Sequence, residues 1–280
     1  MTLAVGAVAG LLAGRLLWLL LRPTFAGQPA LLRQNHRGRP VATAAGVVLP
    51  LTLLLVEGGR AVAATAGVGA AGGPSAARAA VLVAALGFGL VGVFDDLAGT
   101  GERRGFRGHL GALRSGRLTT GAAKLLVGGA VALVTVAPAA GGSAARLLAD
   151  AALVALSANL ANLLDRAPGR ATKSGLAAFL VLAVATGAPS ALAAVAVVAG
   201  AAGALLVDDL HERLMLGDAG ANVLGGTIGL GAVLVCAPGT RTVALVVVVA
   251  LNLASEFVSF SRVIDAVRPL RALDRAGRRP

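Results

Sequence analysis

Residues 78–96 read Arg78-Ala-Ala-Val-Leu-Val-Ala-Ala-Leu-Gly-Phe-Gly-Leu-Val-Gly-Val-Phe-Asp95-Asp96, an apolar run that ends in two adjacent aspartates. Such a run predicts a helix that crosses a membrane. Neighbouring carboxylates repel each other and are costly near lipid, so at a helix end they indicate a cation or a functional pocket. Other apolar runs also end or begin with acids, namely Asp165, Asp208, Asp209 and Asp218. The sequence therefore predicts a set of acids where hydrophobic helices meet water.

Composition predicts an all-α, polytopic membrane protein. Of the 280 residues, 57% are hydrophobic and 14% are charged, against about a quarter charged in soluble domains. With about 20 residues per crossing, nine spans are expected, near 2–21, 41–56, 78–94, 121–140, 146–164, 174–188, 190–207, 219–237 and 241–259. The sixth and seventh are separated only by Pro189, so eight or ten spans remain alternatives. Residues 1–260 form one membrane domain in this interpretation, and 261–280 form a basic cytoplasmic tail.

Basic residues predict the orientation, because cytoplasmic loops accumulate Lys and Arg. Most of the 25 Lys and Arg residues fall in the odd-numbered connections, which places the N-terminus outside and the C-terminus inside. The first apolar run lacks a basic start and is expected to be a retained span. Nearly all acids fall on the inner side; Asp150 lies outside, where a surface pair with Arg146 is expected. The net charge of +12 suits anionic lipid and phosphorylated substrates. Nucleic-acid binding is disfavoured because no basic soluble domain is present.

Four motifs on the predicted inner face resemble a known family. They are Phe94-Asp95-Asp96-Leu97, Leu118-Thr119-Thr120-Gly121-Ala122-Ala123-Lys124, Asn159-Leu160-Ala161-Asn162-Leu163-Leu164-Asp165 and Leu216-Gly217-Asp218-Ala219-Gly220-Ala221-Asn222. In this order they resemble the polyprenyl-phosphate N-acetylhexosamine-1-phosphate transferases, relatives of the phospho-MurNAc-pentapeptide translocase. The resemblance runs from about Gly38 to Glu256.

The resemblance implies a Mg²⁺-dependent enzyme of cell-envelope synthesis. Such an enzyme transfers a sugar 1-phosphate from a UDP-sugar to a polyprenyl phosphate and releases UMP, at the cytoplasmic face of a bacterial cell membrane. Asp218 would bind Mg²⁺, and Lys124 would hold donor phosphates. Asp95 and Asp96 would line the site, and one of the two would deprotonate the acceptor phosphate. The sugar, the prenyl length and the oligomeric state stay open, with a homodimer among the alternatives.

Further substrate contacts follow from the same resemblance. Asn162 and Asp165 would border the nucleotide pocket, and Asn222 would contact substrate. The family's usual Asp-Gly-x-Asp-Gly-Leu is replaced by the loop 165–173, and the histidine-rich loop near the C-terminus is missing. In the replacement loop Arg170 and Lys173 are candidates for binding the donor diphosphate. Lys124 and Lys173 are the only lysines beside 23 arginines.

Each assignment has a structural alternative. Asp95 and Asp96 could be a solvated helix end, and Asp218 could be a helix cap. Asn159 and Asn162 could bond between helices. The tract from Arg103 to His109 is most simply a positive-inside loop. At the level of the whole protein, the alternative is a non-catalytic relative that binds polyprenyl phosphate or an envelope-biogenesis partner. A transporter would carry its ionisable residues near mid-bilayer instead.

Overall fold

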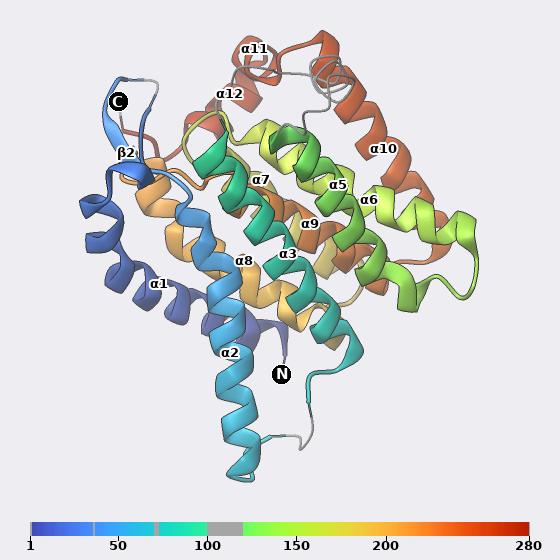
Figure 1. The fold of residues 1–280 in the computed structure, drawn as a ribbon. Coiled ribbons are helices and arrows are strands. Elements are labelled where there is room, and N and C mark those ends of the chain that lie inside the picture. The colour runs from blue at the N-terminus through green and yellow to red at the C-terminus, as the bar shows by residue number, and fades with distance from the viewer. Residues whose placement is uncertain (1, 36, 70–72, 100–119, 280) are drawn as a thin grey trace.

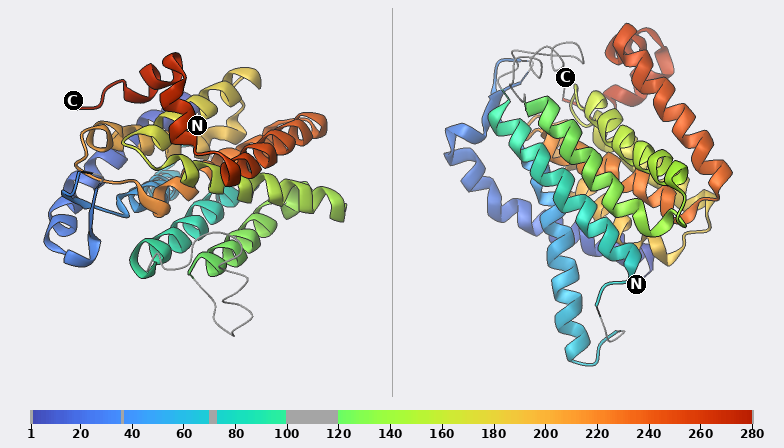
Figure 2. Two further views of the ribbon diagram at one scale, coloured as in Figure 1. Left: turned by 90° about the horizontal axis from the view of Figure 1, so that it is seen from above. Right: turned by 45° about the vertical axis from the view of Figure 1, so that its right-hand side comes forward.

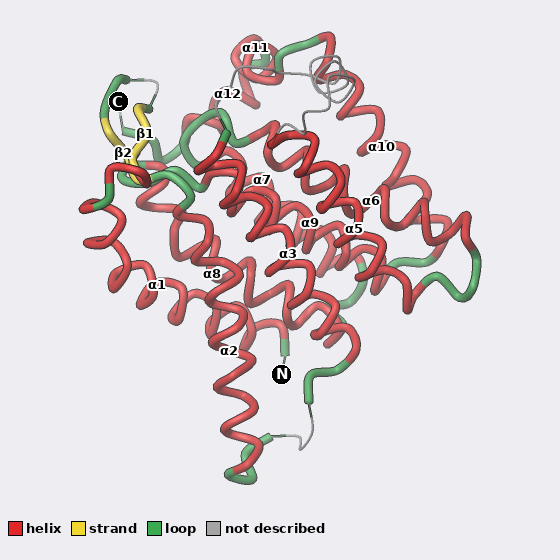
Figure 3. The backbone as a smooth tube through the Cα atoms, viewed as in Figure 1, coloured by secondary structure: helices red, strands yellow, loops and turns green. Residues whose placement is uncertain are grey.

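The computed structural model describes residues 2–35, 37–69, 73–99 and 120–279, which fold into a bundle of long helices (Figure 1). The long helices are α1 (Leu3–Gly27), α2 (Val48–Thr65), α3 (Ala76–Ala98), α5 (Thr120–Val136), α6 (Ala144–Leu164), α7 (Arg170–Ala185), α8 (Ala193–Leu210), α9 (Gly217–Val235) and α10 (Pro238–Phe257). Two short helices follow, α11 (Phe260–Ala266) and α12 (Arg268–Arg275). The predicted all-α class is confirmed, apart from one antiparallel hairpin of β1 (Leu32–Gln34) and β2 (Pro40–Ala42) (Figure 3).

Eight segments of the described chain are long and apolar enough to cross a membrane. They are Leu3–Gly27, Ala45–Thr65, Ala76–Ala98, Thr120–Ala139, Ala144–Leu164, Ser190–Leu210, Gly217–Val235 and Pro238–Phe257. These segments support a polytopic membrane protein. The sixth predicted span corresponds to α7, whose 16 residues are fewer than a full crossing needs. The structure therefore gives eight long spans and one shorter helix where nine spans were expected.

Helices α8 and α9 form the centre of the bundle. Over an 18-residue stretch of each of these two spans 72% of the residues are buried, against 6% over such a stretch of α10. Helix α9 packs between α3 and α6, α8 packs against α1, and α10 touches mainly α6. In the turned view of Figure 2, α1 and α10 accordingly lie on opposite flanks. The outer helices expose leucine and valine side chains, as expected for surfaces that face lipid.

Small residues let α1 and α8 approach backbone to backbone. Gly6, Gly10 and Gly14 repeat every four residues along the buried face of α1. A methyl group at Gly10 would overlap the carbonyl of Val197, and one at Gly200 would overlap the carbonyl of Ala7. Such contacts between small residues are a common basis of helix association in lipid, where the hydrophobic effect between helices is weak.

Two glycines bring the end of α3 against the start of α9. A methyl group at Gly92 would overlap the backbone of Asp218 and Ala219, so α3 and α9 touch there directly. Gly217, the first residue of α9, has a φ of 70°, which favours glycine. A Cβ atom at Gly217 would also lie only 2.7 Å from Oδ2 of Asp96. These contacts place the carboxylates at the end of α3 beside the N-terminus of α9.

Candidate functional site

Lys124 of α5 lies between two carboxylates that come from two other helices. Its Nζ is 3.8 Å from Oδ2 of Asp95 at the end of α3, and it donates a hydrogen bond to Oδ2 of Asp218 at the start of α9. Asn162 of α6 completes the group. With its amide oriented to satisfy both neighbours, Asn162 donates to Oδ1 of Asp218 at 2.6 Å and accepts from Lys124 Nζ at 2.6 Å. We call Asp95, Lys124, Asn162 and Asp218 the Lys124 cluster.

The Lys124 cluster is accessible and carries an excess of negative charge. The side chains of Lys124, Asp95 and Asp218 are 15%, 22% and 21% exposed, so a ligand can reach all three. Two carboxylates face one ammonium group within the cluster. This arrangement can accept a further cation, and the ammonium can also neutralise a phosphate that enters beside it.

Asp96 and Asp165 cap the N-terminus of α9. The carboxylate of Asp96 accepts the backbone N–H groups of Asp218 and Ala219, both at 3.0 Å, and Asp165 accepts that of Gly217 at 3.0 Å. Carboxylates at this position satisfy otherwise unpaired N–H groups and oppose the positive end of the helix dipole. The capping role considered for Asp218 therefore belongs to Asp96 and Asp165, and the Asp218 side chain faces Lys124 instead.

Asp165 lies half-buried just after α6 and among other acids. Burial raises its pKa well above the ordinary value, and the negative charges of Asp209, Asp218 and Asp96 add to the effect. The hydrogen bond from Gly217 lowers the pKa but does not compensate. Asp165 is thereby shifted toward its neutral form. Its carboxylate supports the start of α9 through Gly217.

The two basic residues predicted to bind donor diphosphate contact the chain's own C-terminus. Arg170 donates from Nε and Nη2 to the two carboxylate oxygens of Asp274 at 2.8 and 2.9 Å. Arg278 donates to the same carboxylate at 2.7 Å. Lys173 Nζ donates to the carbonyl oxygens of Leu273, Asp274 and Ala276 at 2.8, 2.7 and 3.1 Å. We call this group the Lys173 cluster; the structure does not bring it into contact with Lys124.

The pKa shifts in the Lys173 cluster reflect this pairing. Burial raises the pKa of Asp274, but the hydrogen bond and charge of Arg170, together with those of Arg278, outweigh burial and hold the pKa below its usual value. Burial lowers the pKa of Lys173, and the neighbouring charge of Arg278 lowers it further. The tail is thus attached to the start of α7 by one carboxylate and several cations.

The asparagines of the motifs divide between two roles. Asn159 donates to Oδ1 of Asn252 on α10 at 2.7 Å, so the interhelical alternative describes it. Asn162 belongs to the Lys124 cluster. Asn222 lies one helical turn after Asp218, on the same side of α9. It is 2% exposed, and within the described chain its Nδ2 has no hydrogen-bond partner. Asn222 thus has an unused donor close to the cluster.

In the described part of the chain, no group of three His, Cys, Asp or Glu side chains is arranged to hold a metal ion. A Mg²⁺ ion in phosphate-transfer sites typically takes only one or two protein carboxylates, and water and substrate phosphates supply its other ligands. Asp95 and Asp218 provide two carboxylates around one cationic position, now taken by the Lys124 ammonium. The residues present therefore fit an ion that arrives with its substrate.

Three further acids have partners that the sequence does not predict. Asp150, expected in a surface pair, is fully buried and is shared by Arg146 at 2.5 Å and Arg241 at 2.6 Å. Asp209 accepts a hydrogen bond from the hydroxyl of Thr172 at 3.1 Å, near the start of α7. Asp208 binds two arginines and the only tryptophan. The sequence offered one signal for this last group, an arginine that interrupts the first apolar run.

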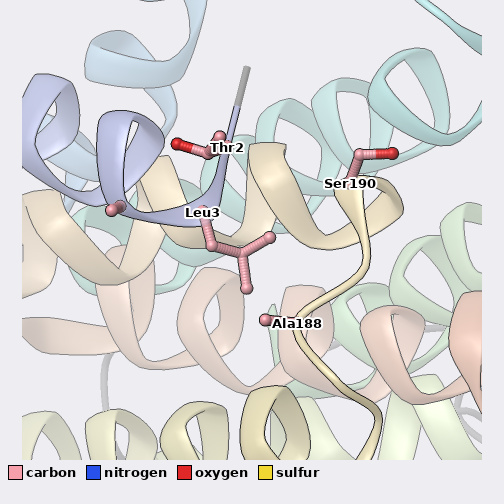
Figure 4. Close-up of a pocket in the computed structure, with 5 residues that line it drawn as sticks. Thr2, Leu3, Ala188 and Ser190 are labelled. Carbon is pink, nitrogen blue, oxygen red and sulfur yellow. The ribbon is translucent and has the colours of Figure 1, made fainter.

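A hollow of about 470 Å³ opens at the other end of the bundle. It is lined by Thr2, Leu3, Ala4, Ala188 and Ser190, near the starts of α1 and α8 (Figure 4). Helix α8 ends at Leu210, next to Asp208 and Asp209, so the length of a span separates the hollow from these acids. Its lining carries no ionisable side chain.

No protein-family model matches the chain, and no curated protein matches it significantly. The tract from Arg103 to His109, and Leu118 and Thr119 of the second motif, lie outside the described ranges.

Proposed function

We propose that this protein transfers a sugar 1-phosphate from a UDP-sugar to a polyprenyl phosphate at the cytoplasmic membrane face and releases UMP. One observation carries the proposal. The Lys124 cluster takes one member from each of the four family-like motifs, although these motifs lie on four different helices. These residues are far apart in sequence but converge at the ends of their helices. Transfer of a phosphoryl group to a lipid phosphate would need such a group of charges where helices meet water beside lipid.

The reaction is a displacement at phosphorus. An oxygen of the polyprenyl phosphate attacks the sugar-bearing phosphorus of the donor, and the bond between that phosphorus and the oxygen of UMP breaks. UMP leaves with the electrons of that bond, and the product is a polyprenyl diphosphate sugar. Lys124 neutralises the donor phosphates, and Asp95 accepts the proton of an acceptor phosphate that arrives protonated. Asp218 and Asp95 would hold Mg²⁺, and the bound ion would supply further charge neutralisation.

The remaining motif residues support this centre. Asp96 and Asp165 fix the start of α9, and hence the direction of the Asp218 carboxylate. Asn162 holds Asp218 and Lys124 at a set separation. Asn222 offers its unused amide donor to a substrate oxygen near Asp218. Asp96 is in this proposal a positioning residue.

The proposal requires the Lys124 cluster to face the cytoplasm. Single cysteines introduced near residues 35 and 275 should react with a membrane-impermeant reagent only from the cytoplasmic side, and one near 142 only from outside. Cys236, the native cysteine, is first replaced by alanine. Labelling of positions 35 and 142 from the same side would contradict the orientation.

A second candidate is a non-catalytic relative that binds polyprenyl phosphate or an envelope-biogenesis partner. The Lys173 cluster favours it, because the basic residues expected to hold the donor are engaged by the tail. Such a protein would hold a lipid phosphate at Lys124 without turning over a nucleotide sugar.

One assay separates the two candidates. Purified protein is incubated with labelled UDP-sugars and undecaprenyl or decaprenyl phosphate, with and without Mg²⁺. The transferase releases UMP only when the ion and the lipid acceptor are both present. Saturable binding of polyprenyl phosphate without UMP release for any donor would support the binding protein instead.

A further inference from the structure

Two arginines converge on one buried carboxylate at the end of α8. Arg15 of α1 donates from Nη1 to Oδ2 of Asp208 at 2.5 Å, and Arg213 donates from Nη1 to Oδ1 at 3.1 Å. The indole N–H of Trp18 donates to Oδ2 at 3.1 Å. The Asp208 side chain is 3% exposed, so both of its oxygens are fully engaged inside the protein.

The same two arginines retain unused donors and unpaired charge. Each guanidinium contributes only Nη1 to a side-chain contact in the described chain, out of five N–H groups. Their side chains are 43% and 40% exposed. Two positive charges thus share one negative charge, and the outward sides of both guanidinium groups are open. Paired guanidinium donors match the oxygens of a phosphate group.

The surroundings of Arg15 on α1 are apolar and exposed. Leu11, Leu12 and Leu19 lie three or four residues from Arg15 and therefore share its side of the helix. Their side chains are 45%, 62% and 47% exposed. Val207, next to Asp208 on α8, is exposed as well. An open pair of arginines beside an exposed leucine face has the chemistry of a lipid: an anionic head with a hydrocarbon chain.

We propose that Arg15 and Arg213 form a binding site for the phosphate of an anionic membrane lipid, whose hydrocarbon chain lies along Leu11, Leu12 and Leu19 of α1. A structural clamp between α1 and α8 needs only one arginine on Asp208. A clamp does not explain the second arginine or the exposure of both side chains, whereas a bound anionic ligand explains both. The site uses none of the Lys124 cluster, so it stands whether or not the proposed transferase activity is found.

Trp18 provides a reporter for this site, because it is the only tryptophan and contacts the same carboxylate. Purified protein in a neutral detergent is titrated with phosphatidylglycerol that carries brominated acyl chains, which quench nearby tryptophan fluorescence. Parallel titrations use brominated phosphatidylcholine, and undecaprenyl phosphate or inorganic phosphate as competitors. We expect saturable quenching by phosphatidylglycerol, with phosphatidylcholine much weaker.

Three variants complete the test. Arg213→Gln leaves the Arg15–Asp208 pair in place and should raise the Kd for phosphatidylglycerol by about tenfold or more. Arg15→Lys keeps a positive charge beside Asp208 but loses the planar guanidinium group with its paired N–H donors, and it should also weaken binding. Arg60→Gln removes an arginine beside another buried acid, Glu57, and should leave the Kd unchanged. Size-exclusion profiles verify that each variant is folded.

The competitors assign the source of the phosphate. Competition by undecaprenyl phosphate supports a site for lipid phosphates in general, and its failure to compete supports one selective for phospholipid. Inorganic phosphate that competes as well as the lipids would overturn the lipid assignment. Equal quenching by phosphatidylcholine, or an unchanged Kd in Arg213→Gln, would overturn the site itself.

Discussion

The two lysines of the chain occupy opposite kinds of surroundings. Lys124 contacts one side chain from each of three other helices and remains partly accessible. Two of these side chains are carboxylates. Lys173 donates all three of its hydrogen bonds to main-chain carbonyl groups of the C-terminal tail. A cation between partly exposed carboxylates can exchange them for a ligand, whereas a cation held by carbonyl groups fixes the path of the chain. Lys173 thus attaches the tail, whereas Lys124 has the surroundings that the proposed function requires.

The largest effect is expected at Asp218, the acid that Lys124 and Asn162 share. Asp218→Asn removes the charge that orders the Lys124 cluster and should lower Mg²⁺-dependent UMP release by about a hundredfold or more. The protein should remain extractable and folded, because Asp96 and Asp165 cap α9 without help from Asp218. Asp265→Asn, at an exposed acid paired with Arg275, is the matched control. If the rate of UMP release by Asp218→Asn were close to that of wild type, the Lys124 cluster would have only a structural role.

Replacement of each lysine by arginine should sharpen the comparison. Lys124→Arg should be nearly as damaging as Lys124→Ala, because the wider guanidinium cannot replace a compact ammonium between Asp95 and Asp218. The loss of one charge-assisted contact costs about 1.5–3 kcal/mol, or roughly tenfold to a hundredfold in rate. Lys173→Arg should retain turnover and thermal stability, since arginine can also donate to carbonyl groups. If both positions tolerated arginine equally well, the proposed difference in role between Lys124 and Lys173 would be contradicted.

A smaller effect is expected from release of the tail. Asp274→Asn leaves the buried guanidinium of Arg170 without its charged partner, which should lower the melting temperature by several degrees. Turnover should fall far less than in Lys124→Ala, because the tail has no member in the Lys124 cluster. Limited proteolysis should cut the variant within residues 260–279 sooner than wild type. A rise in turnover on tail release would instead reveal that the tail blocks donor binding at Arg170 and Lys173.

The smallest expected effect is a pH dependence of tail attachment. The pKa of Asp274 is lowered in the folded protein, so its contribution to stability is present above its unfolded pKa of about 4 and is lost as the pH falls through the lowered folded value. Tail proteolysis in wild type should therefore accelerate only in strongly acidic buffer. Asp274→Asn should lack this acid-dependent step, and persistence of the step in the variant would assign it to another group.

Sequence predicts the helical class and most of the span positions because apolar runs of membrane length have few alternative structures. It also predicts that Asp95, Lys124, Asn162 and Asp218 lie at helix ends. The sequence defines α7 less well, because an apolar run shorter than a full crossing is compatible with either a buried helix or a membrane span.

Sequence could not distinguish the roles of neighbouring residues. Asp95 and Asp96 are about 100° apart around a helix, so one faces Lys124 and the other faces the backbone of α9. Asn159 and Asn162 share one face of α6, yet they contact different partners, α10 and the Lys124 cluster. The sequence also does not reveal the partner of Arg170, because Asp274 follows it by 104 residues and no periodicity connects the two.

The central claim is that Lys124 and Asp218 act on a substrate rather than merely on each other. The most direct test exchanges them, with Lys124→Asp and Asp218→Lys in one chain, and measures thermal stability and UMP release together. Our account predicts that the exchanged pair regains the stability lost by either single substitution, while UMP release stays at background. Recovery of UMP release along with stability would contradict the account, because a pair that works in either direction is only a salt bridge.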